Sequence, residues 1–439
     1  MTPLDTTRTA EDRDGVGYAP EKIHHGWRRA VLAASIGNLI EAYDLLLYGY
    51  LASVLAEQFF PAGDPTAALL DTFAIFAVGF AVRPIGGLVF GHIGDRFGRR
   101  RALAASILLM GAATLAIGLL PTYATTGPLA AALLLACRLA QGFSVGGEYV
   151  GANILVLEHA PDGRAGRTAS INLVAGYLGV AVASATSLLL ARTLDPAELA
   201  AWGWRLPFLA AGPIALIGLY LRVRIPDSPA FADAEPARTS FPLASALRTT
   251  KRGMLIYGGW QMMVSLGGFL LFGYMASYLI RVVGLPPAGA FAAGLVAVLI
   301  VAAGAVAGGA LVDRFPLRPI ALVAAAGIAV TVLPGFLLVR QGGVAAAVAG
   351  QAVWAVFVGI GATVSAVLAV VLFPVHLRYT ATAVGYNIST TVIGSTAPYV
   401  SAWLVANSGN PIAPAWYLAL VALAGLGTAL VGLRPLVRA

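Results

Sequence analysis

The sequence predicts an all-α membrane protein with twelve transmembrane helices in two six-helix bundles, and three observations lead to this fold class. Hydrophobic residues make up 59% of the chain and charged residues only 11%, whereas a soluble domain carries about 25% charged residues. Apolar runs of about 20 residues recur, each long enough to cross ~30 Å of hydrocarbon as a helix. A charged turn around Asp95 is partly repeated around Asp313, which indicates two related bundles.

The apolar runs favour helices over the strands of a membrane β-barrel. They are too long for such strands, and they lack the strands' alternation of apolar and polar residues. Glycines within the runs allow membrane helices to pack closely. The predicted helices span residues 29–58, 67–92, 101–121, 128–159, 168–193, 205–225, 253–282, 286–311, 318–340, 343–375, 381–406 and 411–433.

The largest change in composition divides these helices into two sets of six. The segment between them contains four prolines and alternating acids and bases, which is typical of a linker. The polar N-terminal segment lacks the short basic start and the apolar stretch of a signal peptide. We therefore predict a cytoplasmic tail (1–28), an N-terminal six-helix bundle (29–225), a cytoplasmic linker (226–252) and a C-terminal six-helix bundle (253–439).

Basic residues predict the orientation, because cytoplasmic loops of membrane proteins are rich in Lys and Arg. If the N-terminus is cytoplasmic, most of the 28 Lys and Arg residues fall on the cytoplasmic side. We therefore expect a multi-pass protein of the cell inner membrane with both termini in the cytoplasm. The net charge of +8 then reflects topology, and no basic and aromatic patch suggests a nucleic-acid partner.

The sequence has no pattern typical of an ATP-driven pump or an enzyme. It contains no G-x-x-x-x-G-K-S/T phosphate-binding loop and no Ser-His-Asp set. The single cysteine, Cys137, lies in a predicted helix, so we expect neither an internal disulfide nor a cysteine metal site. The five histidines lie in the tail or at helix ends, so we expect no metal, no cofactor and no histidine proton relay. Transport should therefore draw on an ion gradient.

Ionisable residues inside the predicted helices point to the mechanism, because a charge in hydrocarbon costs several kcal/mol unless it is paired or hydrated. Glu41 and Asp44 are three residues apart and share one helical face. Two carboxylates close together repel each other's charge, so one of them holds a proton more readily. We predict that Glu41, Asp44, Arg138 and Glu148 couple transport to protons, and that Arg138 is a candidate partner for a first-helix carboxylate. The alternatives are a structural tie for Arg138 and a packing role for Glu148.

Polar and aromatic residues of both bundles are candidates for substrate contacts. Arg83 precedes Pro84, where the helix should kink or break, so Arg83 either binds a carboxylate or satisfies carbonyl groups freed by the break. Aromatic faces suit amino or quaternary cations, and simple packing is the alternative for each aromatic residue. The predicted substrate-binding residues are Arg83, Gln141, Tyr48, Asn172, Trp260, Gln261, Tyr386 and Asn387.

Short motifs carry a resemblance that covers nearly the whole chain. They lie at residues 37–44, 48–50, 82–87, 91–101, 138–149, 202–208, 226–229, 373–379 and 386–389. Through these motifs the chain resembles the major facilitator superfamily, and within it the metabolite:proton symporter family. The resemblance implies a central cavity between the two bundles that opens alternately to each side. It also implies a monomer whose partners are a small substrate, protons and the lipid bilayer.

The resemblance further implies a role for the charged turn and its partial copy. In the family, the aspartate and arginines of this turn latch the cytoplasmic side while the protein is open to the outside. Pro316 and Leu317 replace a glycine and an arginine in the second copy, so we expect a weaker or purely structural contact there. The alternative is that the arginines only enforce topology. The predicted latch residues are Gly91, Asp95, Arg96, Gly98, Arg99, Asp313 and Arg314.

The motif in the fourth helix and residues 373–389 are most similar to the osmolyte:proton symporters for proline, betaine and related zwitterions. We therefore expect proton-coupled symport of a small polar metabolite, most simply a zwitterion. Small carboxylates such as citrate, 2-oxoglutarate or shikimate are the alternative substrates, and export or a receptor role are alternative functions. Glu41, Asp44 and Arg138 argue against a receptor. Osmosensing relatives often carry a C-terminal coiled coil, which the chain lacks after its twelfth predicted helix, so osmotic regulation is not expected.

Overall fold

The computed structural model describes residues 27–61, 63–97, 99–146, 148–158, 160–161, 163–223 and 248–433. Every regular element in these residues is a helix. The predicted tail lies outside the described residues except for residues 27–28, and the predicted linker does so except for residues 248–252.

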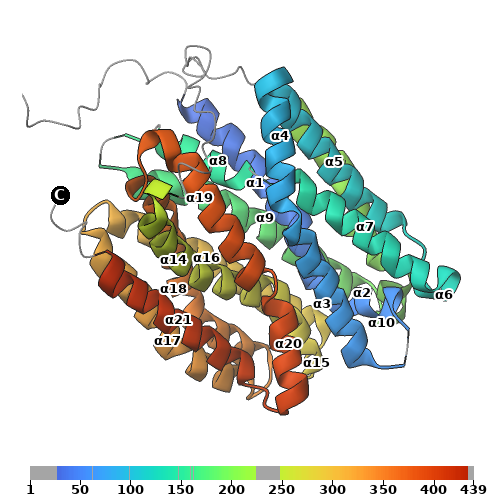
Figure 1. Cartoon of the computed structure of the whole chain (residues 1–439). Coiled ribbons are helices and arrows are strands. Elements are labelled where there is room, and N and C mark those ends of the chain that lie inside the picture. The colour runs from blue at the N-terminus through green and yellow to red at the C-terminus, as the bar shows by residue number, and fades with distance from the viewer. Residues whose placement is uncertain are drawn as a thin grey trace, which may run out of the picture.

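The N-terminal half forms one group of helices, shown in blue to green in Figure 1. Its elements are α1 (Trp27–Tyr50), α2 (Ala52–Phe59), α3 (Pro65–Ala81), α4 (Arg83–Phe97), α5 (Arg99–Leu119), α6 (Tyr123–Thr126), α7 (Pro128–Ser144), α8 (Glu148–Glu158), α9 (Ala165–Thr193), α10 (Pro196–Glu198), the π-helical η1 (Leu199–Gly203) and α11 (Arg205–Val223).

The C-terminal half forms the second group, shown in yellow to red. Its elements are α14 (Lys251–Phe269), the π-helical η2 (Leu270–Tyr274), α15 (Met275–Arg281), α16 (Pro287–Val312), α17 (Leu317–Val339), α18 (Val344–Val371), α19 (Val375–Ser389), the π-helical η3 (Thr390–Gly394), α20 (Ala397–Ser408) and α21 (Ala413–Gly432).

All twelve predicted membrane segments coincide with helices. Among the described residues, eight helical segments are long and apolar enough to span a membrane, or ten when two bent pairs are each counted as one span. The first bent pair turns by 63° between α1 and α2, and the second by 43° before α11. The two remaining predicted segments are α5, whose apolar part is shorter, and the broken run α19–η3–α20.

The two groups of helices meet mainly along α9 and α16, which pack against each other over much of their length. Within the groups, α1 packs on α9, α5 on α11, and α16 and α17 on α18. Glycine permits the close approach between the groups, because a Cβ on Gly166 would lie 2.4 Å from the Gly309 carbonyl oxygen. This contact lies at the end of the molecule where α9 begins and α16 ends.

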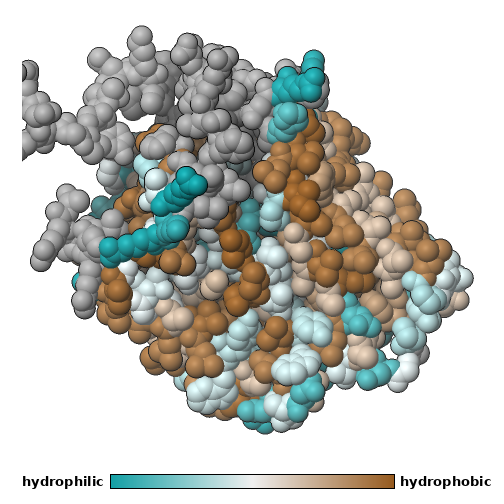
Figure 2. Space-filling model, viewed as in Figure 1, coloured by the Kyte–Doolittle hydropathy of each residue, from teal (hydrophilic) through white to brown (hydrophobic). Residues whose placement is uncertain are grey.

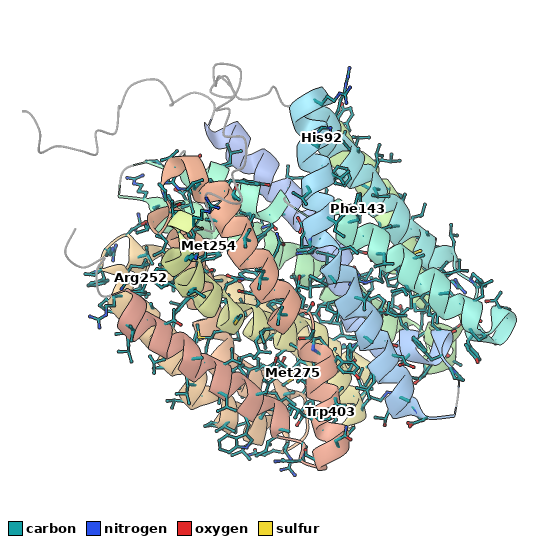
Figure 3. The ribbon with its side chains drawn as sticks, in the orientation of Figure 1. His92, Phe143, Arg252, Met254, Met275 and Trp403 are labelled. Carbon is teal, nitrogen blue, oxygen red and sulfur yellow. The ribbon has the colours of Figure 1, made fainter. Side chains whose placement is uncertain are left out.

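The described surface suits a lipid environment. Figure 2 shows hydrophobic residues over most of the visible helix faces, with hydrophilic residues gathered toward the edges. Figure 3 places His92 at the end of α4 and Arg252 at the start of α14, on the side where Figure 1 shows α1 beginning. Trp403 of α20 lies toward the opposite side and is 45% exposed, a position that suits an aromatic ring at a membrane interface.

Candidate functional site

A buried ion pair joins the first two predicted membrane segments. The Arg83 Nη2 atom lies 3.7 Å from the Glu41 Oε1 atom, and both side chains are less than 10% exposed. Arg83 is the first residue of α4, directly after the break that follows α3. Its guanidinium also lies 4.3 Å from the centre of the Phe80 ring. The Arg83 guanidinium therefore contacts both a carboxylate and the face of an aromatic ring. Such partners stabilise a cation that is buried away from water.

Asp44 lies one turn beyond Glu41 on α1 and is 1% exposed. Neither of its carboxylate oxygens has a hydrogen-bond partner in the described part of the chain, although the Thr114 hydroxyl of α5 and the Glu41 carboxylate lie close by. A charged carboxylate in such surroundings is costly. This environment differs from that of Glu41, which has Arg83 beside it.

Arg138 of α7 is also 1% exposed and has no acidic partner in the described part of the chain. Its guanidinium lies 4.5 Å from the Tyr48 ring centre and 4.8 Å from that of Phe76. Its Nη1 atom donates a 2.8 Å hydrogen bond to the Gln141 Oε1 atom. The Gln141 Nε2 atom in turn donates to the Thr114 hydroxyl at 2.7 Å. Arg138 is thus held by aromatic faces and a neutral amide.

These contacts correct one detail of the sequence analysis. Arg138 was the candidate partner of a first-helix carboxylate, but Arg83 takes that position at Glu41. Arg83 follows the single residue that separates α3 from α4 and lies beside Glu41 of α1, while Arg138 is enclosed by Tyr48 and Phe76.

Four tyrosines gather between the two bundles, and we call them the tyrosine cluster: Tyr149, Tyr177, Tyr257 and Tyr386. The rings of Tyr149 and Tyr386 stack with their centres 4.8 Å apart, which joins α8 to α19. Tyr177 of α9 and Tyr257 of α14 lie close to both of them. The Tyr386 hydroxyl also lies beside Arg83 and Thr390. The cluster is therefore adjacent to the Arg83–Glu41 pair.

A small cavity lies beside the tyrosine cluster and between the bundles. It offers about 10 Å³ of space for water centres, roughly room for one water. Residues from α8, α14, α18 and α19 surround it: Tyr149, Val150, Asn153, Tyr257, Gln261, Ser365, Ala366, Ala369 and Thr382. These lining residues are polar, aromatic or small, and none is charged.

Hydrogen bonds fix the amide side chains around this cavity. In α8, Asn153 accepts a 2.7 Å hydrogen bond from the Asn172 Nδ2 atom, and the Asn172 carbonyl accepts from Asn38 at 2.8 Å. In α14, Gln261 donates to Ser265 at 2.9 Å and accepts from the Ser365 hydroxyl. The amides are thus held in place before any substrate arrives.

The structure separates the predicted substrate residues into two groups. Gln261 lines the cavity, and Tyr386 and Arg83 lie beside it through the tyrosine cluster. The others are tied into the helices or lie apart from the cavity lining. Tyr48 donates a hydrogen bond to the Thr72 carbonyl at 3.0 Å, and Trp260 donates one to the Gly361 carbonyl at 3.1 Å. Gln141 and Asn172 form hydrogen bonds with other side chains. Asn387 is half-buried.

Several site residues were absent from the predicted set. Tyr149 belongs to the motif at residues 138–149 but was not assigned a contact, and Tyr257 lies in the predicted helix 253–282 without an assigned role. Tyr177, Thr114 and Ser365 carried no signal, since single polar or aromatic residues are common in membrane helices. Glu148 was predicted to couple protons, but its side chain lies outside the described residues.

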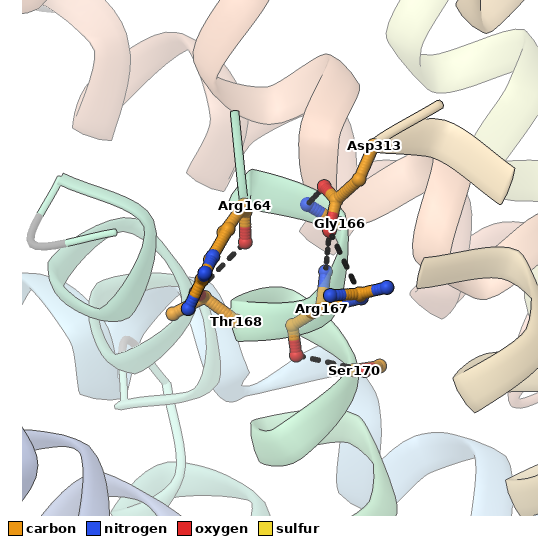
Figure 4. Close-up of polar contacts among 6 residues, drawn as sticks. All are labelled: Arg164, Gly166, Arg167, Thr168, Ser170 and Asp313. Atoms are coloured by element: carbon orange, nitrogen blue, oxygen red, sulfur yellow. Dashed lines mark hydrogen bonds and ion pairs between the residues drawn. The ribbon is translucent and has the colours of Figure 1, made fainter. Parts of the chain in front are cut away.

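The second copy of the charged turn makes a specific contact between the bundles, drawn in Figure 4. The Asp313 Oδ1 atom accepts a 2.7 Å hydrogen bond from the Gly166 N–H, and Oδ2 accepts from the Arg167 N–H at 3.2 Å. The Arg167 Nε atom lies 3.7 Å from Oδ2. Asp313 therefore places a negative charge at the N-terminal end of α9, where the helix dipole favours it. Pro316 and Leu317 predict a weaker or purely structural contact here.

The first copy of the turn is described only in part. Arg96 and Arg314 are exposed. The Gly98 backbone and the Gly91, Asp95 and Arg99 side-chain environments lie outside the described residues. A further ion pair at the same end of the molecule joins Arg378 of α19 to Glu158 of α8 at 2.7 Å.

The opposite end of the molecule is also closed by contacts between the bundles. Arg281 of α15 pairs with Glu57 of α2 at 2.5 Å, and the Ser53 and Ser277 hydroxyls are 3.0 Å apart. The Ser184 hydroxyl donates to the Phe291 carbonyl at 2.9 Å. The cavity thus lies between two closed ends. The described residues contain no group of three or more His, Cys, Asp or Glu that could hold a metal.

Comparison with known sequences gives consistent matches over most of the chain. The model of the Major Facilitator Superfamily matches residues 34–398. A proline/betaine transporter of Escherichia coli strain K12 is 37% identical over 418 residues, which cover 91% of this chain and 82% of the relative. A glycine betaine/proline/ectoine/pipecolic acid transporter, OusA, of Dickeya dadantii strain 3937 is 35% identical, with 92% and 82% covered.

Solved structures show the same fold. A D-xylose-proton symporter superposes with a TM-score of 0.74 at 20% sequence identity, covering 93% of this chain and 97% of that one. The partially occluded inward-open xylose transporter XylE from E. coli gives a TM-score of 0.73 at 19% identity, with 92% and 96% covered. The two-bundle, twelve-helix fold predicted from the sequence is thereby confirmed.

Proposed function

The chain belongs to the Major Facilitator Superfamily, and from this premise we propose that it is a proton-coupled symporter for a small zwitterion such as proline or betaine. It is a multi-pass membrane transporter rather than an enzyme. We further propose that it lies in the cell inner membrane as a monomer with both termini in the cytoplasm.

One observation carries the proposed substrate class: the tyrosine cluster lies directly beside the Arg83–Glu41 pair. Tyrosine faces attract amino and quaternary ammonium cations, and a guanidinium binds a carboxylate through two parallel hydrogen bonds. A small zwitterion carries both groups a few ångströms apart. The two subsites are therefore adjacent in the way that such a substrate requires.

The stacked Tyr149 and Tyr386 rings belong to different bundles, and their faces cover each other in this closed state. We propose that the substrate cation enters between them when the cavity widens, while the substrate carboxylate replaces Glu41 at Arg83. Binding would then bridge the two bundles. Closure around the substrate would exclude water, which strengthens both charge interactions.

Asp44 is the proposed proton carrier, since it is buried beside Glu41 and has no hydrogen-bond partner in the described part of the chain. A neutral carboxyl group fits this environment in the closed state. Opening to water on one side would allow the proton to leave. The gradient thus supplies the free energy for accumulation.

Two alternatives have specific support. Arg83 and Arg138 would also suit a small carboxylate, but the cavity lining contains no charged residue, which disfavours citrate with its several charges. Export uses the same fold in the opposite direction. The relatives are a proline/betaine transporter and a glycine betaine/proline/ectoine/pipecolic acid transporter, which supports zwitterions as the first substrates to test.

The deciding experiment is uptake of labelled betaine and proline into liposomes that contain the purified protein, with and without an imposed pH gradient. Citrate and 2-oxoglutarate serve as competitors. We expect accumulation of a zwitterion that collapses when an uncoupler is added. Competition by carboxylates alone would overturn the substrate class, and accumulation that ignores the uncoupler would overturn the proton coupling.

A further inference from the structure

A run of buried polar side chains crosses the C-terminal bundle, starting at the small cavity. The Ser365 hydroxyl of α18 donates a hydrogen bond to the Gln261 Oε1 atom, and the Gln261 Nε2 atom donates to the Ser265 hydroxyl at 2.9 Å. The Ser265 and Thr390 hydroxyls are 3.1 Å apart, which carries the run from α14 to η3. Each of the four residues is at most 6% exposed. We call these four residues the polar chain.

The far end of the polar chain meets Tyr386 beside Arg83. The Thr390 N–H bonds the Tyr386 carbonyl one turn back, so the two side chains share one face of the helix. The Tyr386 hydroxyl lies beside both Thr390 and Arg83. The next residue, Thr391, donates a 3.3 Å hydrogen bond to the Phe80 carbonyl in the last turn of α3. This bond holds η3 against the segment that leads to Arg83.

The donors and acceptors of the polar chain define a direction. Gln261 accepts at Oε1 and donates from Nε2, so the Ser265 oxygen accepts a hydrogen and keeps its own for Thr390. A hydroxyl has one hydrogen and two lone pairs, and a guanidinium has donors only. The Tyr386 oxygen can therefore accept from Thr390 on one side and from Arg83 on the other. Its own hydrogen is then left for an acceptor outside the polar chain.

We propose that the polar chain positions the Tyr386 hydroxyl as a hydrogen-bond donor to the substrate carboxylate. The inference rests on the proposed zwitterion transport and gives positioning roles to Ser265 and Thr390, two residues without a predicted role. In the closed state Glu41 lies near the Tyr386 hydroxyl, at the place proposed for the substrate carboxylate. A carboxylate that accepts from both a hydroxyl and a guanidinium gains two charge-assisted hydrogen bonds. Tyr386 would thus contact both charges of a zwitterion, the cation with its ring and the carboxylate with its hydroxyl.

The test is the affinity of the purified protein for betaine, dimethylglycine and choline, measured at one pH by competition with labelled betaine. Betaine and dimethylglycine carry the carboxylate, whereas choline has the quaternary ammonium without it. Thr390→Val removes the hydroxyl that positions Tyr386, so the Kd of betaine and of dimethylglycine should each rise about three- to tenfold. The Kd of choline should stay within about twofold of the parent, because the ring faces remain. Ser265→Ala should act in the same direction by less, since Thr390 keeps its hydroxyl.

Ser389→Ala is the matched control. Ser389 directly precedes Thr390, is 1% exposed and donates a 2.9 Å hydrogen bond to the Gly258 carbonyl of α14. It ties the same stretch of chain to α14 but lies outside the polar chain, so its loss should leave the three affinities at their parental values. Thr390→Ser keeps the hydroxyl and should restore the affinity for betaine.

The outcomes separate this inference from the proposed function. If the parent binds betaine and Thr390→Val binds it equally well, the positioning role is wrong and zwitterion transport stands. An equal rise in the Kd of choline, or the same loss in Ser389→Ala, would mean that the change only loosens helix packing, and it would overturn the inference. If the parent binds neither betaine nor dimethylglycine, the proposed substrate class fails and this inference fails with it.

Discussion

Arg83 and Glu41 form an ion pair across two helices, with 3.7 Å between Nη2 and Oε1 and less than 10% of either side chain exposed. Asp44, one turn further along α1, is without such a cation in the described part of the chain. Two carboxylates on one helical face therefore have different surroundings. We propose that this difference gives substrate binding to the Arg83–Glu41 pair and proton transfer to Asp44, and the predictions below test the two roles separately.

Asp44→Asn should abolish accumulation driven by a pH gradient but retain substrate binding. Asparagine has the shape of a protonated aspartate and cannot release a proton. Uptake into liposomes should fall at least tenfold, while the thermal shift caused by betaine or proline should persist. Asp71→Asn is the control, because Asp71 is exposed; full proton-driven uptake in Asp44→Asn would contradict the assignment.

Arg83→Gln should weaken substrate binding more than it changes the maximal rate. The guanidinium is the proposed partner of the substrate carboxylate, and losing a charge-assisted pair typically costs one to two orders of magnitude in affinity. We expect KM for a zwitterion to rise about 10-fold to 100-fold in liposome uptake. Arg281→Gln, at the far closed end, is the comparison; an unchanged KM in Arg83→Gln would exclude the contact.

Tyr386→Phe and Tyr386→Leu should differ if the ring face binds a cation. Phenylalanine keeps the aromatic face and leucine does not, and a cation over a ring contributes about 0.5–2 kcal/mol. Betaine affinity, measured by thermal shift or competition, should fall between about twofold and thirtyfold in the leucine variant and change less in the phenylalanine variant. The same pair of changes at Tyr149 should behave alike, and equal losses in both variants would point to the hydroxyl instead.

Asp313→Asn should loosen the closed end at which α9 begins. The carboxylate accepts from two backbone N–H groups of that helix and lies near Arg167, and asparagine offers one acceptor without charge. A cysteine placed at Asn153 in a variant that lacks Cys137 should react faster with a membrane-impermeant maleimide applied from that side. Arg314→Gln, at an exposed neighbour, should leave the labelling rate unchanged; equal rates in Asp313→Asn and its parent would argue against a latch.

The architecture could be predicted from the sequence because it depends on local patterns of apolar and charged residues. The length of an apolar run decides where a chain can cross the bilayer as a helix, and all twelve predicted segments are helical. The helix break near Arg83 followed from Pro84 for a similar reason, since proline removes a backbone donor at a known position. Glu41, Asp44, Arg83 and Arg138 stood out because charges are rare in hydrocarbon.

Only the tertiary structure decided which partner each of these residues takes. The sequence made Arg138 the candidate partner of a first-helix carboxylate, whereas Arg83 lies at Glu41 and Arg138 is held by Gln141. Tyr149 and Tyr386, far apart in sequence, stack across the two bundles. Such contacts depend on the rotation and crossing of whole helices, which packing over many residues sets. Hydropathy and charge therefore determine that a side chain is buried, and packing between helices determines what it meets there.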